Sequence, residues 1–91
     1  MEDVDRRFIE LLGRLKSLDW HDGASRADFM ITDAQELIEH GEQGVALENI
    51  CQNLYEFSVP ISQHDLTEIS LFAETMQMPE STWKFLQEIV A

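Results

Sequence analysis

The sequence predicts an all-α protein, a compact bundle of about five helices in a single domain over residues 1–91. Three observations carry this prediction. Apolar residues recur at helical spacing in separate segments, a glycine or proline stands between neighbouring segments, and no stretch alternates between apolar and polar residues as a strand does. A chain of this length forms one modest core with a radius of gyration of about 12 Å, which leaves little room for a deep substrate cleft.

The first predicted helix covers 4–18. One of its faces is apolar, because apolar residues stand there at helical spacing: Val4, Phe8, Leu11, Leu12, Leu15 and Leu18. The next segment, DWHDGASRAD at 19–28, predicts a loop, since Gly23 and several Asp and Ser residues favour turns.

The second predicted helix ends at about His40. Its apolar stripe consists of Met30, Ala34, Leu37 and Ile38. Gly41 follows the stripe at the position where a helix end commonly requires a left-handed residue. The opposite face is polar and is expected to be solvated: Asp28, Thr32, Gln35, Glu36 and Glu39.

The third predicted helix begins near Glu42, where an acid in the first turn suits the helix dipole. Its inward residues are Leu47, Ile50, Cys51 and Leu54. Gly41 and Gly44 predict a tight elbow, the first through a positive φ angle and the second through close approach of the two backbones. Helices two and three are therefore expected to be antiparallel neighbours.

Two further helices are predicted after Pro60. Ser62 is the expected N-cap of the fourth helix, supported by Asp65 three residues later. The inward residues of that helix are Leu66, Ile69, Phe72, Ala73 and Met76. Pro79 ends it, and a short last helix is marked by Trp83, Leu86, Ile89 and Val90.

The charge of the chain is strongly negative. Six basic residues stand against 18 acidic ones, for a formal net charge of -12. No Lys or Arg occurs from Ala27 to Trp83, whereas eleven Asp and Glu do. With 44% hydrophobic residues, the composition is that of a globular domain and not of a disordered acidic tail. The charge argues against nucleic acid and anionic membranes as direct partners and favours a basic protein.

Catalytic and metal-binding patterns do not stand out. Glu39, His40 and Glu42 are close in sequence, but such neighbours point in different directions on a helix, so His40 is expected to be a helix-end residue. His21 and His64 lack nearby ligand spacing, and the lone Cys51 is expected to be buried. We therefore expect no enzyme activity, no small-molecule substrate, no metal and no cofactor. The absence of a signal or membrane-spanning pattern predicts a cytoplasmic protein.

One edge of the third helix differs from an ordinary solvated face. Glu48, Gln52, Tyr55 and Glu56 follow one another at helical spacing beside its apolar stripe. Tyr55 is either a residue that flanks the core with a hydrated hydroxyl or an anchor for a protein partner. On the second reading, the predicted partner-binding residues are Glu36, Glu39, Glu42, Glu48, Gln52, Tyr55 and Glu56.

The stretch ELIEHGEQGVALENICQNLYEFSVPIS, with the later MPESTWKFLQ, resembles the MafI family of immunity proteins. The resemblance covers roughly 34–86. Its most telling parts are the Glu-x-Gly-x-Ala-Leu-Glu run at 42–48 and the Leu-Tyr-Glu at 54–56. It implies a small bacterial protein that binds and neutralises a cognate toxin, often a nuclease. No catalytic motif is implied. The resemblance does not decide whether the toxin contacts the strip of helix three, formed by Glu48, Gln52, Tyr55 and Glu56, or the exposed face of helix two.

Two other classes of function are compatible with parts of the sequence. An acidic nucleic-acid mimic or adaptor, binding a cellular nucleic-acid-binding protein, would carry the same charge, and only the identity of the partner separates it from an immunity protein. A small hydrolase would need a convergent polar pocket, for which the sequence gives no sign.

Overall fold

The computed structural model describes residues 3–21 and 23–91, which form four α-helices and a 3₁₀-helical C-terminal segment. The elements are α1 (Asp3–Lys16), α2 (Ala24–Glu39), α3 (Gln43–Glu56), α4 (Gln63–Thr75), η1 (Glu80–Thr82) and η2 (Lys84–Ile89). Within the described residues there is no strand, only an isolated bridge between Ile61 and Val90. The predicted all-α bundle is therefore confirmed, and its radius of gyration is 11.9 Å.

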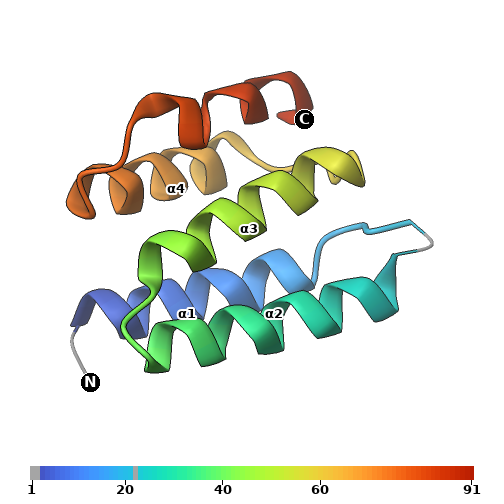
Figure 1. The fold of residues 1–91 in the computed structure, drawn as a ribbon. Helices are drawn as coiled ribbons and strands as arrows, with labels where there is room; N and C mark the ends of the chain where they lie inside the picture. The colour runs from blue at the N-terminus through green and yellow to red at the C-terminus, as the bar shows by residue number, and fades with distance from the viewer. Residues whose placement is uncertain (1–2, 22) are drawn as a thin grey trace.

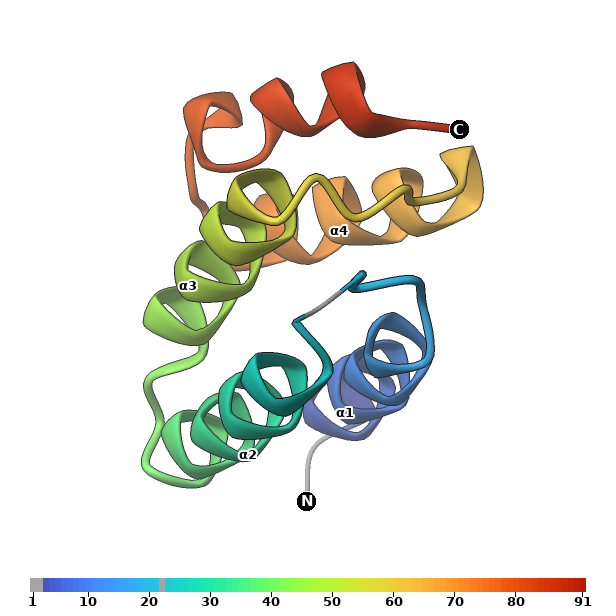
Figure 2. The ribbon, with the colours of Figure 1, turned by 90° about the vertical axis from the view of Figure 1, so that its right-hand side faces the viewer.

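The helices lie in two layers joined by α3. Helices α1 and α2 run in opposite directions in one layer, while α4 and the C-terminal segment lie in the other (Figure 1). Helix α3 leaves the end of α2 and rises to the second layer, as the view turned by 90° shows (Figure 2). It contacts α2 on one side and the 3₁₀ segment on the other. The predicted reversal between helices two and three is thus present.

The core contains many of the residues that the helical spacing identified, together with others that it did not, such as Trp20, Val59 and Ile61. Phe8 of α1 stacks on Phe72 of α4, with ring centroids 5.1 Å apart. Leu47, Ile50, Cys51 and Leu54 of α3 are all buried, as predicted. Fully burying a side chain of this size stabilises the fold by about 1.5–3 kcal/mol, which is how a chain this short remains folded.

The start of α2 differs from the prediction, because the expected loop at 19–28 already becomes helical at Ala24. Ala27 is buried and extends the stripe of Met30, Ile31 and Ala34 backwards by one turn. Burial of that turn outweighs the turn preference of its Ser and Asp residues, which face outward. The Gly23 amide donates to the Trp20 carbonyl at 2.7 Å, so the true turn is shorter than predicted. Asp22, part of the predicted loop, lies outside the described residues.

The last predicted helix is present, but its geometry is 3₁₀ and not α. The Ile61 amide donates to the Ile89 carbonyl at 3.1 Å, and the Ala91 amide donates to the Ile61 carbonyl at 2.9 Å. These bonds draw Val90 into an extended conformation, so the segment cannot continue as a helix. No helix among the described residues combines the length and apolar character needed to cross a membrane.

Candidate partner-binding surface

Six carboxylates on or between α2 and α3 make no ion pair with a described residue. Basic residues pair with other acids: Arg6 with Asp3, Arg14 with Asp65 and Glu68, Lys16 with Asp28 of α2, and Lys84 with Glu80. Asp5, Glu10, Glu74 and Glu88 also lack an ion pair there, so this property is not confined to α2 and α3. We call the following residues the α2–α3 acids: Asp33, Glu36, Glu39, Glu42, Glu48 and Glu56. None of them makes an ion pair with any residue in 3–21 or 23–91, and all except the half-buried Asp33 are exposed.

Several of these charges stand where they oppose helix stability. Glu36 and Glu39 lie in the last turn of α2, and Glu56 ends α3, yet neither last turn contains a basic residue. A helix C-terminus carries partial negative charge, so each carboxylate there costs roughly 0.3–1 kcal/mol where a cation would stabilise by as much. Folding therefore does not account for this placement.

The elbow between α2 and α3 has the predicted backbone at its first glycine. Gly41 has a φ angle of 78°, and its amide donates to the Ile38 carbonyl at 3.1 Å. The Glu42 amide donates to the Leu37 carbonyl at 2.7 Å, which closes the helix end. His40 is the C-cap, as expected of a helix-end residue, and its Nδ1 lies 2.8 Å from the Glu36 carbonyl oxygen.

Two expectations about this elbow are wrong. Gly44 does not bring the backbones of α2 and α3 together, because a Cβ there would instead meet the Met78 sulfur at 3.4 Å. Glu42 is the N-cap residue of α3 and not part of its first turn, which contains no acid. Its carboxylate makes no capping bond and is exposed to solvent.

The predicted strip on α3 faces the C-terminal segment. Glu48 and Gln52 line a shallow hollow together with Met78, Pro79 and Phe85. The Tyr55 ring contacts Phe85 edge to face, with ring centroids 5.2 Å apart and planes at 83°.

Tyr55 is also hydrogen bonded within the chain. Its hydroxyl donates to Glu88 Oε1 at 3.1 Å, and this bond to a carboxylate raises the pKa of Tyr55. The side chain nonetheless remains 40% exposed.

The seven predicted residues are all exposed, but they fall into separate groups. Glu36 and Glu39 lie on α2, whereas Glu48, Gln52 and Tyr55 lie on the side of α3 turned toward η1 and η2. The side of α3 turned toward α2 carries Asn49 and Asn53 instead. Glu42 stands at the elbow and Glu56 at the far end of α3. The fold therefore does not join the seven residues into one continuous strip across α2 and α3.

Sequence reasoning missed Phe29, which is 63% exposed on α2. It lines a hollow between α2 and α3 together with Arg26, Asp33, Asn49 and Asn53. The Arg26 guanidinium carbon lies 5.7 Å from the centre of the Phe29 ring. A signal was available: Phe29 falls within the polar face of the helix, four residues before Asp33 and seven before Glu36, and so lies off the apolar stripe.

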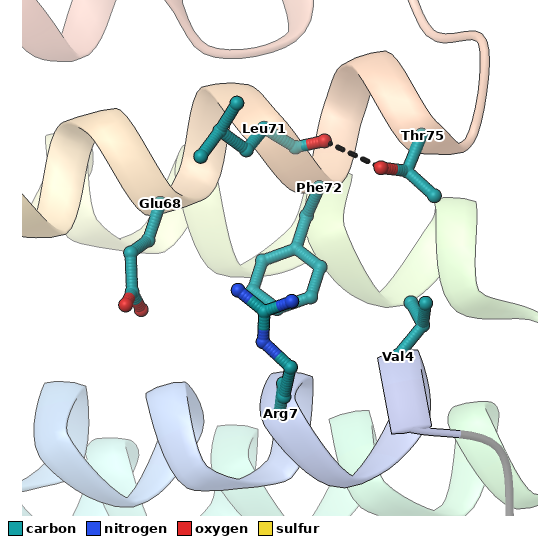
Figure 3. Close-up of a pocket in the computed structure, with 6 residues that line it drawn as sticks. All are labelled: Val4, Arg7, Glu68, Leu71, Phe72 and Thr75. Carbon is teal, nitrogen blue, oxygen red and sulfur yellow. Dashed lines mark hydrogen bonds between the residues drawn. The ribbon is translucent and has the colours of Figure 1, made fainter.

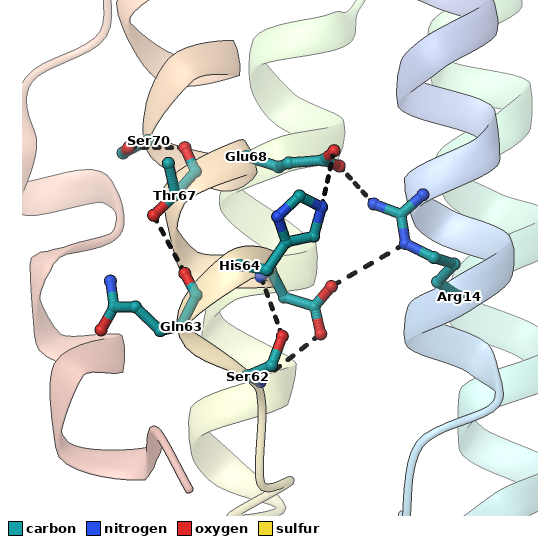
Figure 4. A network of polar contacts seen from close by, with 8 residues as sticks. Arg14, Ser62, Gln63, His64, Thr67, Glu68 and Ser70 are labelled. Carbon is teal, nitrogen blue, oxygen red and sulfur yellow. Dashed lines mark hydrogen bonds and ion pairs between the residues drawn. The ribbon is translucent and has the colours of Figure 1, made fainter.

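A polar network joins α1 to the first turn of α4 (Figure 4). Ser62 Oγ accepts a hydrogen bond from the Asp65 amide at 3.0 Å, and Asp65 accepts one from the Ser62 amide at 3.5 Å, so the predicted capping is present. Arg14 pairs with Asp65 at 3.9 Å and with Glu68, and Glu68 also lies 3.3 Å from His64. Because these groups pair with one another, the network accounts for the burial of Asp65 and indicates a structural role.

The hollow between α1 and α4 is small (Figure 3). Its volume is about 50 Å³, enough for only a few water molecules. It is lined by Val4, Arg7, Glu68, Leu71, Phe72 and Thr75. The Thr75 hydroxyl donates to the Leu71 carbonyl at 2.9 Å and so serves its own helix. A substrate pocket is not formed here.

Titratable groups elsewhere do not assemble a reactive centre in the described part of the chain. Cys51 is buried, and burial raises the pKa of its thiol to about 12, with a further contribution from Glu48. Among residues 3–21 and 23–91, no group of three or more His, Cys, Asp and Glu side chains is arranged to hold a metal ion. Comparisons with family models, with curated proteins and with solved structures found no match to this chain.

Proposed function

We propose that this chain is a small acidic immunity protein that binds and neutralises a cognate bacterial toxin, a nuclease domain with a basic surface. It acts in the cytoplasm and has no catalytic activity of its own. The observation that carries the proposal is the set of α2–α3 acids, which lack ion pairs with the described residues and in part oppose helix stability.

The chemistry of a nuclease complements such a surface. A nuclease binds the phosphate backbone through Lys and Arg, and an acidic protein competes for the same groups. Long-range attraction between opposite charges also raises the rate of encounter. The resemblance of 42–48 and 54–56 to MafI immunity proteins supports the same role.

The first prediction concerns binding to the toxin domain encoded beside this chain, with its nuclease centre inactivated by mutation. We expect association at about 10⁸ M⁻¹s⁻¹ or faster at low salt, because the charges steer the encounter. Raising ionic strength from about 0.01 M to 1 M shortens the Debye length from about 30 Å to about 3 Å and should slow association by tens of fold or more. Stopped-flow fluorescence across this range measures the effect.

Protection of cells is the second part of the same test. Cells that produce the active toxin domain should survive only when this chain is present, and the purified complex should not cleave nucleic acid. An association rate indifferent to salt, or a toxin domain with an acidic surface, would contradict the charge argument. If the adjacent domain is not bound while a cellular nucleic-acid-binding protein is, the chain is a nucleic-acid mimic and not an immunity protein.

A further inference from the structure

We infer that the hollow between α2 and α3 lined by Phe29, Asp33, Asn49 and Asn53, here called the Phe29 hollow, receives an arginine side chain of the basic partner protein. This inference rests on the proposed function and names the contact centre within it. It replaces Tyr55 as the expected anchor.

Phe29 is the most exposed of the large hydrophobic residues in the described chain, ahead of Leu71, Val45 and Tyr55. Two of the other three are less suited to a basic partner. Tyr55 is engaged with Phe85 and Glu88. Leu71 lies beside Arg7 and Glu68, and Glu68 is already paired with Arg14. Phe29 instead combines an exposed aromatic ring, over which Arg26 of the same helix lies, with the nearby Asp33, which lacks an ion pair in the described chain.

The polar groups around Phe29 have unused hydrogen-bonding capacity. Asp33 and the Asn49 side chain make no hydrogen bond with any described residue. The Asn53 side chain donates to the Asn49 carbonyl at 2.7 Å, which leaves its own oxygen available as an acceptor. Asp33 is half-buried, so a cation placed on it would be partly shielded from water. These groups together present acceptors to an incoming donor.

The geometry favours arginine over other occupants. Phe29 and Asp33 are four residues apart on one helix, so their Cβ atoms lie about 5–6 Å from each other. A planar guanidinium can stack on an aromatic ring and donate paired hydrogen bonds to a carboxylate, which the ammonium of lysine cannot do in the same way. Arg26 of the chain already places its guanidinium over the Phe29 ring. The ring therefore accepts this group, and Arg26 competes with the partner for it.

The test uses the inactivated toxin domain encoded beside this chain and measures the dissociation constant for single variants. We expect Phe29→Ala to weaken binding about thirtyfold or more, as loss of an interface anchor does, although it changes no charge. Asp33→Asn should weaken binding about tenfold or more, through loss of a charged hydrogen bond. Arg26→Gln should strengthen binding several-fold, because it removes both the competitor for the ring and a like charge facing the basic partner.

Two control variants separate this hollow from other exposed residues. Leu71→Ala removes a similarly exposed apolar side chain, 51% exposed, from the opposite layer and should leave affinity within about twofold. Tyr55→Ala tests the strip on α3. Circular dichroism and thermal unfolding check that each variant is folded, which is expected because all of the changed side chains except Asp33 are exposed and Asp33 is half-buried.

The outcomes distinguish this inference from the proposed function. If the parent chain binds the toxin domain but Phe29→Ala binds equally well, the Phe29 hollow is not the contact centre and the proposed function stands. The same holds if Arg26→Gln weakens binding, or if only Tyr55→Ala does. If the parent chain does not bind the toxin domain, the proposed function and this inference both fail.

Discussion

Left-handed backbone at single residues ends three of the four α-helices. Gly41 after α2, Ser58 after α3 and Gln77 after α4 have φ angles of 78°, 51° and 59°. In each case the next amide donates to a carbonyl five residues earlier, as in the bonds from Val59 to Leu54 and from Met78 to Ala73. A residue with a side chain pays roughly 1–2 kcal/mol for this conformation, and glycine does not.

The replacement Gln77→Gly should therefore raise the free energy of unfolding by about 0.5–1 kcal/mol. Urea denaturation measures this change. The matched control is Gln52→Gly in the middle of α3, which should lower the free energy of unfolding by about 1 kcal/mol because glycine disfavours a helix interior. Equal effects of the two substitutions would show that the conformation at Gln77 is not strained.

Prediction from sequence reached only the first of these three positions. Glycine at Gly41 marks a left-handed residue because other amino acids avoid that conformation. Ser58 and Gln77 carry no such mark, since their conformation is imposed by the packing of Val59 and Met78, which follow them and contact the core. The chemistry of those residues alone does not reveal it.

At the C-terminal ends of two helices, acidic side chains lower the stability of the helix. The last turns of α2 and α4 contain Glu39 and Glu74 respectively, and neither contains a basic residue. Both carboxylates face the negative end of a helix dipole. Only Glu39 belongs to the α2–α3 acids.

This pair permits a matched prediction. Glu39→Gln and Glu74→Gln should each raise the free energy of unfolding by about 0.3–1 kcal/mol, measured by chemical denaturation at low salt. Both change the net charge equally, but only Glu39→Gln should slow association with the toxin domain, because the carboxylate it removes belongs to the proposed contact surface. Equal slowing by the two variants would mean that total charge, and not the position of the acids, sets the rate.

Most elements were predictable because helical periodicity and capping residues agree. The predicted stripe of α3 is fully buried, those of α1 and α4 are buried except for the partly buried Val4, Leu18 and Met76, and Ser62 begins α4 as expected. The first turn of α2 was missed because Ser25 and Asp28 resemble a loop until Ala27 is known to be buried. The 3₁₀ form of the last segment depends on the bridge between Ile61 and Val90, a contact between distant residues that local sequence does not encode.

The whole molecule has one core, and Cys51 lies fully buried within it on α3. Its thiol cannot meet a reagent unless α3 separates from its neighbours, so its reactivity reports opening of the molecule. Burial holds the folded pKa at about 12, well above the ordinary value of 9.0.

Labelling of Cys51 by a disulfide reagent at pH 8 should thus be slower than in the denatured chain by about a thousandfold or more. Absorbance of the released thiolate follows the reaction, and labelling at the rate of a free thiol would contradict the burial.

Since the folded pKa of Cys51 is raised, the stability linked to this thiol is present below about pH 9 and is lost as pH rises toward 12. Cys51→Ala should flatten this alkaline loss of stability.

The candidate partner-binding surface was only partly predictable from the sequence. The sequence indicates where carboxylates lack basic neighbours, and the structure places Glu36, Glu39 and Glu42 in solvent as expected. The sequence does not indicate that α3 turns Glu48 and Tyr55 toward η1 and η2, because that contact joins distant parts of the chain. The Phe29 hollow likewise depends on the packing of α3 beside α2.

The short connections between helices allow the chain to fold quickly. Only residues 40–42 separate α2 from α3, and 57–62 separate α3 from α4, so these neighbouring helices meet without closing a long loop. Helical proteins built from such local contacts fold within microseconds to milliseconds. Synthesis proceeds at about 5–20 residues per second, so the acidic surface forms almost as soon as these residues have left the ribosome. If the chain neutralises a toxin as proposed, a cell that makes both would have little interval in which the toxin is unopposed.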